Sequence, residues 1–186
     1  MDSTMSSPAA GAPQPQSRDV RTLVLLRHGK SAYPPGVSDH DRPLAPRGRR
    51  EAGLAGQWIL RNAPTLDYIL CSSAARTRQT LEATGLVTPT VLVDVSSSIY
   101  EAYPEELLEL ITAAPQADRT LLLVGHAPGV PGLAEALAGP GSNSEALQDM
   151  DAKFPTSAIA VLEVDGAWSD VGDGTTRLVD FVVPRA

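Results

Sequence analysis

The sequence predicts an α/β fold, a three-layer α/β/α sandwich whose mostly parallel central sheet is covered by helices on both faces. Several short runs are almost wholly apolar, which is typical of strands buried on both faces. Each of the first four runs is followed by a segment with helical spacing of its apolar residues, and this alternation favours parallel strands joined by helices. A chain of 186 residues suits one domain with a single core.

The first strand and helix are predicted close to the start of the apolar sequence. Residues 22–27 (TLVLLR) form an apolar run of strand length, so we expect a central strand there. Pro46 then opens a helix that runs to about Arg61, because proline is favoured in the first helical turn. The buried stripe of this helix is expected at Leu54, Trp58 and either Arg61 or Leu60.

The middle of the chain continues the alternation. Residues 66–72 (LDYILCS) predict a second strand, and residues 74–86 predict a helix that ends at Gly85. A third strand is expected at 90–95. The helix after it, at 104–114, is well marked, since it begins with proline and two acidic residues that complement the positive end of its dipole.

The last third of the chain begins with one more strand and helix. After them, the helical spacing of apolar residues gives way to a loop and two strands. The elements are predicted in this order: a strand at 119–126, a helix at 129–139 interrupted early by Pro131, a polar loop at 140–153, and two closing strands at 157–170 and 176–183 that pair around Asp165-Gly166.

The N-terminal segment differs in composition from the rest of the chain. Residues 1–19 are rich in Ser, Ala, Pro, Gly and Gln and have few large apolar side chains, which predicts a disordered N-terminal tail. The folded domain is therefore expected at residues 20–186.

Charge and composition exclude several classes of function. The net charge of −7 argues against nucleic-acid binding, because contact with a phosphate backbone needs a basic surface. No apolar run is long enough to cross a bilayer, and the N-terminus lacks the apolar core of a signal peptide, so we expect a cytoplasmic protein without a membrane partner. The single cysteine excludes an intramolecular disulfide.

Three segments place cationic or imidazole side chains at one edge of the predicted sheet. Arg27 and His28 follow one strand, His126 follows another, and Arg76 lies in the first turn of a helix that follows a third. Ligands of open α/β sheets bind at the carboxyl ends of the strands, so we expect these residues to converge on a phosphate. Gly29 is expected to turn the chain tightly and to leave backbone N–H groups open to the anion.

Other uses of these residue types are less consistent with the sequence. A metal site would need a third ligand, and His40 lies in a Pro-rich loop away from the other histidines. Cys71 is followed by an arginine at a spacing one residue short of the phosphate loop of cysteine phosphatases, so we expect a buried structural cysteine. Arg42 lies in a basic run that is expected to be a solvated surface, with docking of an acidic partner as the alternative.

Five segments, in chain order, resemble the histidine phosphatase superfamily, which includes phosphoglycerate mutases, and within it the small SixA-type phosphohistidine phosphatases. The segments are LVLLRHGKSA, DHDRPLAPRGRREA, DYILCSSAARTRQT, IYEAYPEELLELI and LLLVGHAPGV. The resemblance covers about residues 20–183. It implies a phosphoglycerate mutase-like fold and a phosphate pocket made of Arg27, His28, Arg76 and His126.

The resemblance also implies a mechanism. His28 is the implied nucleophile, which forms a phosphohistidine that water then hydrolyses. The other three residues neutralise the phosphoryl oxygens, with Gly29 and Arg42 as further substrate contacts, and neither a metal nor an organic cofactor is required. Lys30 departs from the superfamily, in which an acidic residue often follows this glycine.

The general acid and the substrate remain open at this point. Glu101 matches the position of the superfamily's acid best and Glu105 is second, or no residue takes this role. A phosphohistidine substrate has an easily expelled imidazole leaving group, and the short segments between the motifs suggest an open pocket, so we expect a histidine-phosphorylated protein as substrate and partner. The alternatives are a small phosphate ester, such as a sugar phosphate or nucleotide, and a non-catalytic phosphate-binding module.

Overall fold

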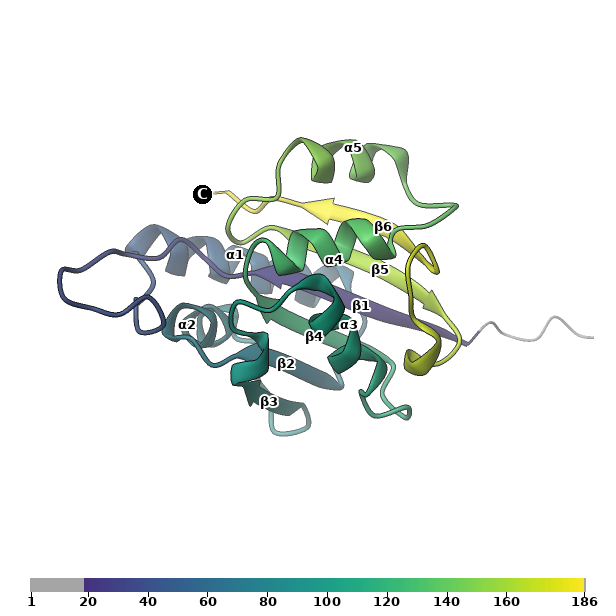
Figure 1. Ribbon diagram of the computed structural model, residues 1–186, viewed down its shortest axis with the longest axis horizontal. Coiled ribbons are helices and arrows are strands. Elements are labelled where there is room, and N and C mark those ends of the chain that lie inside the picture. Colours follow the sequence, from purple (N-terminus) through teal and green to yellow (C-terminus); the bar gives the residue numbers. More distant parts are fainter. Residues whose placement is uncertain (1–18, 186) are drawn as a thin grey trace, which may run out of the picture.

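The computed structural model describes residues 19–185 (Figure 1). Except for Asp19, the predicted tail lies outside the described residues. In chain order the elements are β1 (Val20–Arg27), α1 (Pro46–Asn62), β2 (Tyr68–Ser72), α2 (Ala75–Thr84), β3 (Leu92–Ser96), the short 3-10 helix η1 (Ser97–Ile99), α3 (Pro104–Thr112), β4 (Thr120–Gly125), α4 (Gly129–Leu137), α5 (Ser144–Ala152), β5 (Ile159–Asp165), a second 3-10 helix η2 (Trp168–Asp170) and β6 (Thr176–Val182).

The six strands form one sheet in the order β3-β2-β4-β1-β5-β6. β1 lies inside the sheet, parallel to β4 and antiparallel to β5, and β2 is parallel to both β3 and β4. Because β6 is antiparallel to β5, only β5 runs against the other strands. The predicted mostly parallel sheet and the central position of the first strand are therefore confirmed.

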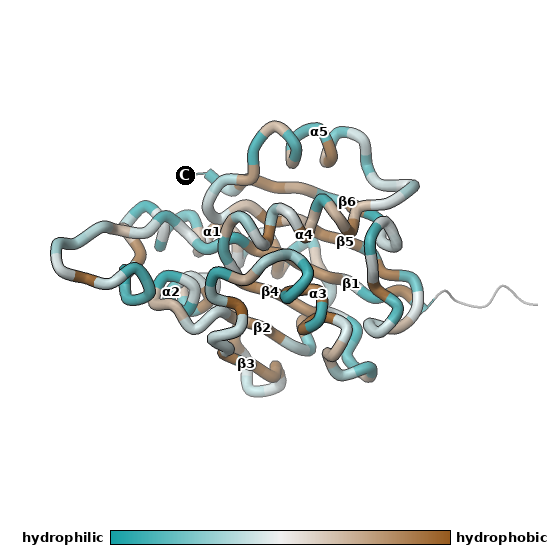
Figure 2. The backbone as a smooth tube through the Cα atoms, viewed as in Figure 1, coloured by the Kyte–Doolittle hydropathy of each residue, from teal (hydrophilic) through white to brown (hydrophobic). Residues whose placement is uncertain are grey.

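Helices cover both faces of this sheet, as predicted (Figure 1). In β1, Leu23 and Leu25 belong to the hydrophobic cluster under α3, α4 and α5, whereas Val24 and Leu26 belong to the cluster under α1 and α2. Successive side chains of a strand point to opposite faces, so a continuous apolar run supplies both layers. Figure 2 shows the result, with the most hydrophobic backbone segments along the central strands.

One predicted loop is a helix. The sequence favours a polar loop over 140–153, but the chain forms α5 at Ser144–Ala152. Asn143 caps this helix, because its side chain accepts hydrogen bonds from the backbone N–H groups of Glu145 and Ala146. Ala146 and Met150 are buried, and the other positions are mostly polar. So narrow an apolar stripe hides the helical periodicity.

The buried side of α1 also differs from the prediction. Leu54 and Trp58 are only partly buried, and the residues that face the core are mainly Ala52, Ala55 and Ile59. A helix that packs closely on its neighbours places small side chains at the contact, and α1 lies directly against α2. The larger apolar side chains were therefore a misleading guide to its inner face.

The chain from β5 to β6 is longer than a hairpin turn at Asp165-Gly166. It contains η2, and Trp168 there is fully buried with its indole N–H donating to the carbonyl of Asp118 at 2.8 Å. Pro131 lies in the first turn of α4, where proline is tolerated, and does not interrupt that helix. Across residues 19–185, every helix is too short or too polar to traverse a lipid bilayer.

Candidate active site

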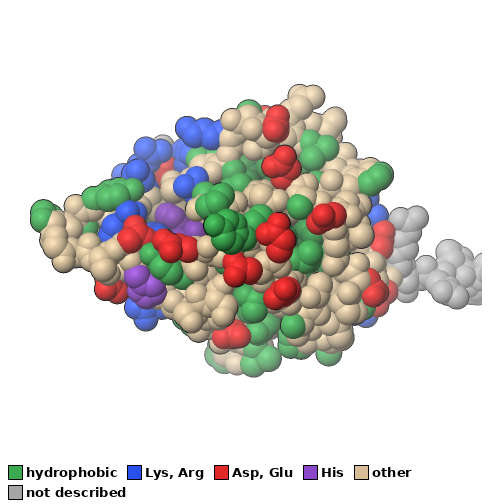
Figure 3. Space-filling model, viewed as in Figure 1, with side chains coloured by type: hydrophobic (Ala, Val, Ile, Leu, Met, Phe, Trp, Pro, Cys, Tyr) green, Lys and Arg blue, Asp and Glu red, His purple; other side chains and the backbone are tan. Residues whose placement is uncertain are grey.

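The carboxyl ends of β1 and β4 bring two histidines together. The strands are in register, with Arg27 opposite Gly125, so His28 and His126 emerge side by side. The backbone N–H of His28 donates to the carbonyl of Gly125 at 3.0 Å and extends the ladder by one bond. The two imidazole rings lie 5.1 Å apart between centroids. In Figure 3 the histidines lie at this end of the sheet, among lysine, arginine and acidic side chains.

His28 is held in one tautomer. Its side chain is buried, and Nδ1 lies 2.7 Å from the carbonyl oxygen of Gly29. A carbonyl oxygen only accepts hydrogen bonds, so Nδ1 carries the proton and Nε2 keeps a lone pair. Burial, followed by the charges of Arg76 and Arg27, lowers the pKa of His28 to about 4. The imidazole is therefore neutral at pH 7.

His126 is a neutral hydrogen-bonding group in the same site. Its Nε2 lies 2.7 Å from Oγ of Ser72. Burial, followed by the neighbouring His28 and Arg76, lowers the pKa of His126 to about 3. Nδ1 is buried and has no partner among residues 19–185. When the Ser72 hydroxyl donates to Nε2, Nδ1 carries the proton and is free to donate to a ligand.

Two arginines leave buried donors free beside the histidines. Arg27 donates from Nη1 to the carbonyl of Phe154 at 2.7 Å. Arg76 donates from Nη1 to the carbonyl of Asp39 at 2.6 Å and from Nη2 to its carboxylate at 3.0 Å. The Nε atoms of both arginines are buried without a partner in the described part of the chain. With His126 they form a set of unpaired donors that suits a tetrahedral oxyanion.

Gly29 has a different role from the one predicted. Its backbone N–H is not open to an anion, because it donates to Oγ1 of Thr80 at 2.9 Å. A side chain at this position would place Cβ 2.7 Å from the carbonyl oxygen of Gly48. Glycine is therefore required by the close approach of α1, and the expected anion contact through this N–H is wrong.

Arg42 lies at the edge of the site rather than on a solvated surface. Nη1 donates to the carboxylate of Asp39 at 2.8 Å, and Nη2 donates to Oγ of Ser31. The guanidinium also lies 3.7 Å from the ring centre of Tyr33, which is the geometry of a cation–π contact. These contacts fix Arg42 next to the residues that hold Arg76.

Asp39 and Tyr100 are members of the site that the sequence did not reveal. The Asp39 carboxylate accepts from Arg42, from Arg76 and, at 2.8 Å, from the hydroxyl of Tyr100. The hydrogen bond from Tyr100, and then the two arginines, lower the pKa of Asp39. The Tyr100 ring lies 5.5 Å from that of His126. The DHDR segment was a signal for the pair of Asp39 and Arg42, but nothing in the sequence links it to Tyr100.

The two candidate acids lie at the outer side of this cluster. Glu101 directly follows Tyr100, is exposed, and has a backbone φ of 56°, a left-handed value that is uncommon for residues other than glycine. Glu105 is in the first turn of α3 and is exposed. Lys30, the departure from the superfamily pattern, is exposed, and its Nζ is 5.9 Å from the ring centre of Tyr33.

Rival chemistries receive no support from the described residues. Cys71 is fully buried in β2, and burial raises the pKa of its thiol to about 12, so a thiolate nucleophile is excluded near neutral pH. Within residues 19–185, no group of three or more His, Cys, Asp or Glu side chains is arranged to hold a metal ion.

Comparisons with known proteins identify the family of the chain. Residues 23–103 match the family model of the histidine phosphatase superfamily (branch 1). An uncharacterised protein of Mycobacterium tuberculosis (strain H37Rv) is 49% identical over 161 residues, which are 86% of this chain and 100% of that protein.

Two solved structures are similar over most of their length. A candidate phosphohistidine phosphatase SixA from Nakamurella multipartitia is 38% identical, with a TM-score of 0.80 over 90% of this chain and 98% of that chain. The protein histidine phosphatase SixA complexed with tungstate is 26% identical, with a TM-score of 0.66 over 88% of this chain and 97% of that chain. The chain therefore belongs to the SixA-type branch of the histidine phosphatase superfamily, and is a phosphatase.

Proposed function

We propose that this phosphatase transfers a phosphoryl group from a histidine-phosphorylated protein to His28, and from His28 to water. The observation that carries the proposal is the hydrogen bond from His28 Nδ1 to the Gly29 carbonyl. It leaves Nε2 with a lone pair in a site lined by cationic and N–H donors, which is the state that a nucleophile for phosphorus needs.

The reaction proceeds by two in-line displacements. The substrate's phosphoimidazole ring is first protonated by solvent on its free nitrogen. Nε2 of His28 then attacks phosphorus while the bond from phosphorus to the substrate's other ring nitrogen breaks, and the substrate histidine leaves as a neutral imidazole. Water then attacks the phosphorus of phospho-His28, the new P–N bond breaks, and inorganic phosphate departs. Arg27, Arg76 and His126 bind the phosphoryl oxygens in both steps, since phosphoryl transfer depends mainly on positioning and electrostatics.

Phosphohistidine is the favoured substrate because the site offers little help to a poor leaving group. An alkoxide needs a general acid held at the leaving oxygen. Glu101 is the best candidate, but it is exposed and makes no hydrogen bond or ion pair with any residue between 19 and 185. An imidazole leaving group does not depend on such an acid. The SixA relative that binds tungstate, a tetrahedral oxyanion, is consistent with this substrate class.

A side-by-side assay tests the substrate class. Wild-type protein is given a histidine-phosphorylated protein, a panel of sugar phosphates and nucleotides, and an aryl phosphate. We expect kcat/KM to be highest for the phosphohistidine protein, and Glu101→Gln to leave that value nearly unchanged. Preference for one of the small esters, with a large loss in Glu101→Gln, would assign the enzyme to ester hydrolysis. Binding of phosphate without turnover of any substrate would identify a recognition module.

A further inference from the structure

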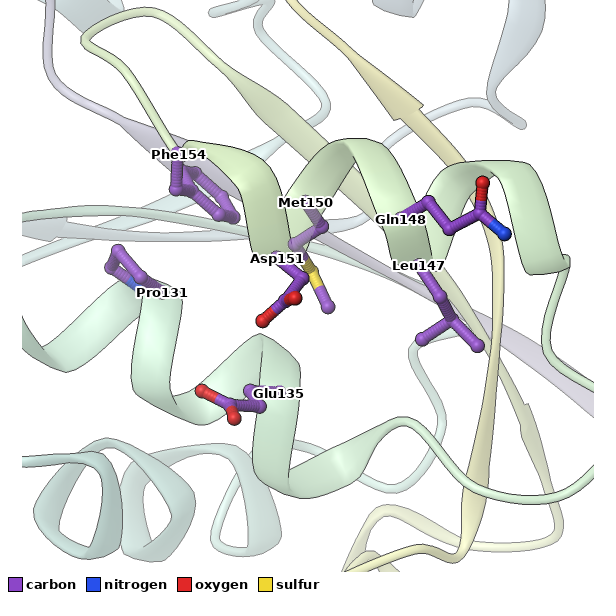
Figure 4. Close-up of a pocket in the computed structure, with 7 residues that line it drawn as sticks. All are labelled: Pro131, Glu135, Leu147, Gln148, Met150, Asp151 and Phe154. Atoms are coloured by element: carbon purple, nitrogen blue, oxygen red, sulfur yellow. The ribbon is translucent and has the colours of Figure 1, made fainter.

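A groove separates α4 from α5 on the face of the sheet that carries α3 (Figure 4). It has a volume of about 510 Å³. α4 packs on α3 and β1, whereas α5 packs on β6, so the two helices leave this space between them. The side chains that matter here are four apolar ones and two acidic ones: Pro131, Leu147, Met150, Phe154, Glu135 and Asp151.

Two carboxylates face each other across this groove. Figure 4 shows Glu135, from α4, and Asp151, from α5, directed toward the same space with apolar side chains around them. Both side chains are exposed, and neither forms an ion pair with a residue in the range 19–185. Like charges that face each other repel, and a cation between them relieves the repulsion. The groove therefore has the chemistry that receives an apolar stem with a positive end.

The three helices around the groove carry charge of one sign only. α3, α4 and α5 contain seven acidic residues and no lysine, arginine or histidine. The acidic residues are Glu105, Glu106, Glu109, Glu135, Glu145, Asp149 and Asp151. Figure 3 shows acidic side chains spread over this face, while most of the cationic ones lie on the left of the view with the histidines and others lie at the right edge. A partner with positive charge close to a negative phosphoryl group is complementary to both regions.

The groove adjoins the site at two points. Phe154 lines the groove, and its carbonyl oxygen is the acceptor for Nη1 of Arg27 at 2.7 Å. At the other wall, α4 begins just after His126, and the backbone N–H of Val130 donates to the His126 carbonyl at 2.8 Å. A polypeptide whose phosphorylated residue enters the site therefore has only to pass between Phe154 and the start of α4 to place a neighbouring side chain in the groove.

We propose that the groove between α4 and α5 binds a lysine or arginine side chain of the phosphoprotein substrate. The methylene stem packs on Leu147, Met150 and Phe154, and the cation lies between Glu135 and Asp151. This inference rests on the proposed function and adds to it a selection rule. The enzyme prefers proteins that present a basic residue close to the phosphorylated histidine, and small phosphate compounds do not use the groove.

Phosphohistidine peptides test this rule. One set of short synthetic peptides carries a lysine at successive positions after a single phosphohistidine, and a matched set carries glutamine there. For the best lysine position we expect a KM about tenfold lower than for its glutamine partner, with little change in kcat, because glutamine forms neither of the two charge pairs that lysine makes with the exposed carboxylates of Glu135 and Asp151. The preference should fall at high ionic strength.

Variants of the groove identify where the preference arises. The double variant Glu135→Gln with Asp151→Asn should raise KM for the lysine peptide about tenfold and leave the glutamine peptide and an aryl phosphate unchanged. Asp149→Asn is the matched control, because Asp149 is on the same helix but lines the cavities on its other side. Glu135→Lys should reverse the preference toward a peptide with glutamate in place of lysine.

Each outcome is informative. An unchanged KM for the lysine peptide in the double variant, or an equal loss in Asp149→Asn, overturns the groove while leaving the proposed function intact. Failure of the wild-type enzyme to hydrolyse both the lysine and the glutamine peptides, with the aryl phosphate still hydrolysed, overturns the proposed substrate class instead. The aryl phosphate also reports on the catalytic residues, since it reaches the site without the groove.

Discussion

In the proposed mechanism, His28 attacks phosphorus only while its imidazole is unprotonated. Its pKa is lowered from 6.5 to about 4, with burial as the largest cause. Because the pKa is lowered, the imidazole of His28 stays neutral as the pH falls to about 4. It can therefore act as the proposed nucleophile at pH values at which a free histidine is already charged.

The titration of His28 and His126 checks this directly. We expect the imidazole nitrogens of both residues, followed by nitrogen NMR with His28→Gln and His126→Gln variants for assignment, to report neutral rings at pH 5.5, since their pKa values are about 4 and about 3. Protonation of both rings between pH 6 and 7 would contradict the burial on which the mechanism depends.

Asp39 positions the arginines of the site. In Asp39→Asn the carboxylate charge between Arg76 and Arg42 is lost, and we expect kcat/KM on an aryl phosphate to fall about tenfold, mainly through kcat, because charge-assisted hydrogen bonds hold the guanidinium groups in place. Tyr100→Phe removes one of the carboxylate's hydrogen bonds and should cost less.

The neighbouring acid is the control for this variant. Asp41 contacts Ser38 and His40 rather than an arginine, so Asp41→Asn should leave the rate unchanged. A faster reaction, or a lower Ki for inorganic phosphate, in Asp39→Asn would mean that the carboxylate competes with the substrate instead of positioning its ligands.

At the scale of the elements, α1 fixes the loop that carries His28. A Cβ at Gly48 would lie 2.1 Å from the carbonyl oxygen of Lys30, whereas one at Gly53 would lie 3.6 Å from that of Ala83. We expect Gly48→Ala to lower the free energy of unfolding by about 1–3 kcal/mol and to reduce kcat, because the helix is pushed away from the loop.

Gly53→Ala is the matched change on the same helix. It makes only ordinary contact and should raise the free energy of unfolding by up to about 1 kcal/mol, because alanine favours the helix more than glycine does. Urea unfolding of both variants measures the difference. Equal stabilities would show that the close approach of α1 to residue 30 does not limit the structure.

The elements that the sequence predicted well are those whose pattern has only one physical interpretation. An apolar run such as residues 22–27 must be covered on both faces, and Pro104 with Glu105 marks one end of α3. α5 was missed because only Ala146 and Met150 are buried on it, and the cap at Asn143 was its main local signal. A local sequence pattern predicts an element least well when that element buries few apolar side chains.

The same limit applies to the candidate site. His28, Arg27, Arg76 and His126 could be predicted to lie together, since each is next to the end of a strand and strand ends share an edge. The bond from Tyr100 to Asp39 joins residues that are distant in the chain, and it depends on how two loops pack after the sheet has formed. No periodicity or motif encodes such a contact.

At the scale of the whole molecule, the fold serves to bring separate segments to one edge of a rigid sheet. β1 supplies the proposed nucleophile, β4 and α2 supply donors, and the segment after α5 holds Arg27 through the carbonyl of Phe154. The face beside this edge carries only acidic helices, so the molecule has a cationic site next to an anionic surface. Under the proposal above, the anionic surface is where the substrate protein places its basic residue.

The measurement that tests the central claim most directly is identification of the phosphorylated enzyme. The wild-type protein is mixed with a radiolabelled phosphoryl donor, quenched with alkali and mapped by mass spectrometry. The account predicts an acid-labile, alkali-stable phosphoryl group on His28, and neither label nor turnover in a folded His28→Ala variant. A phosphoryl group on another residue, or wild-type turnover in His28→Ala, would contradict it.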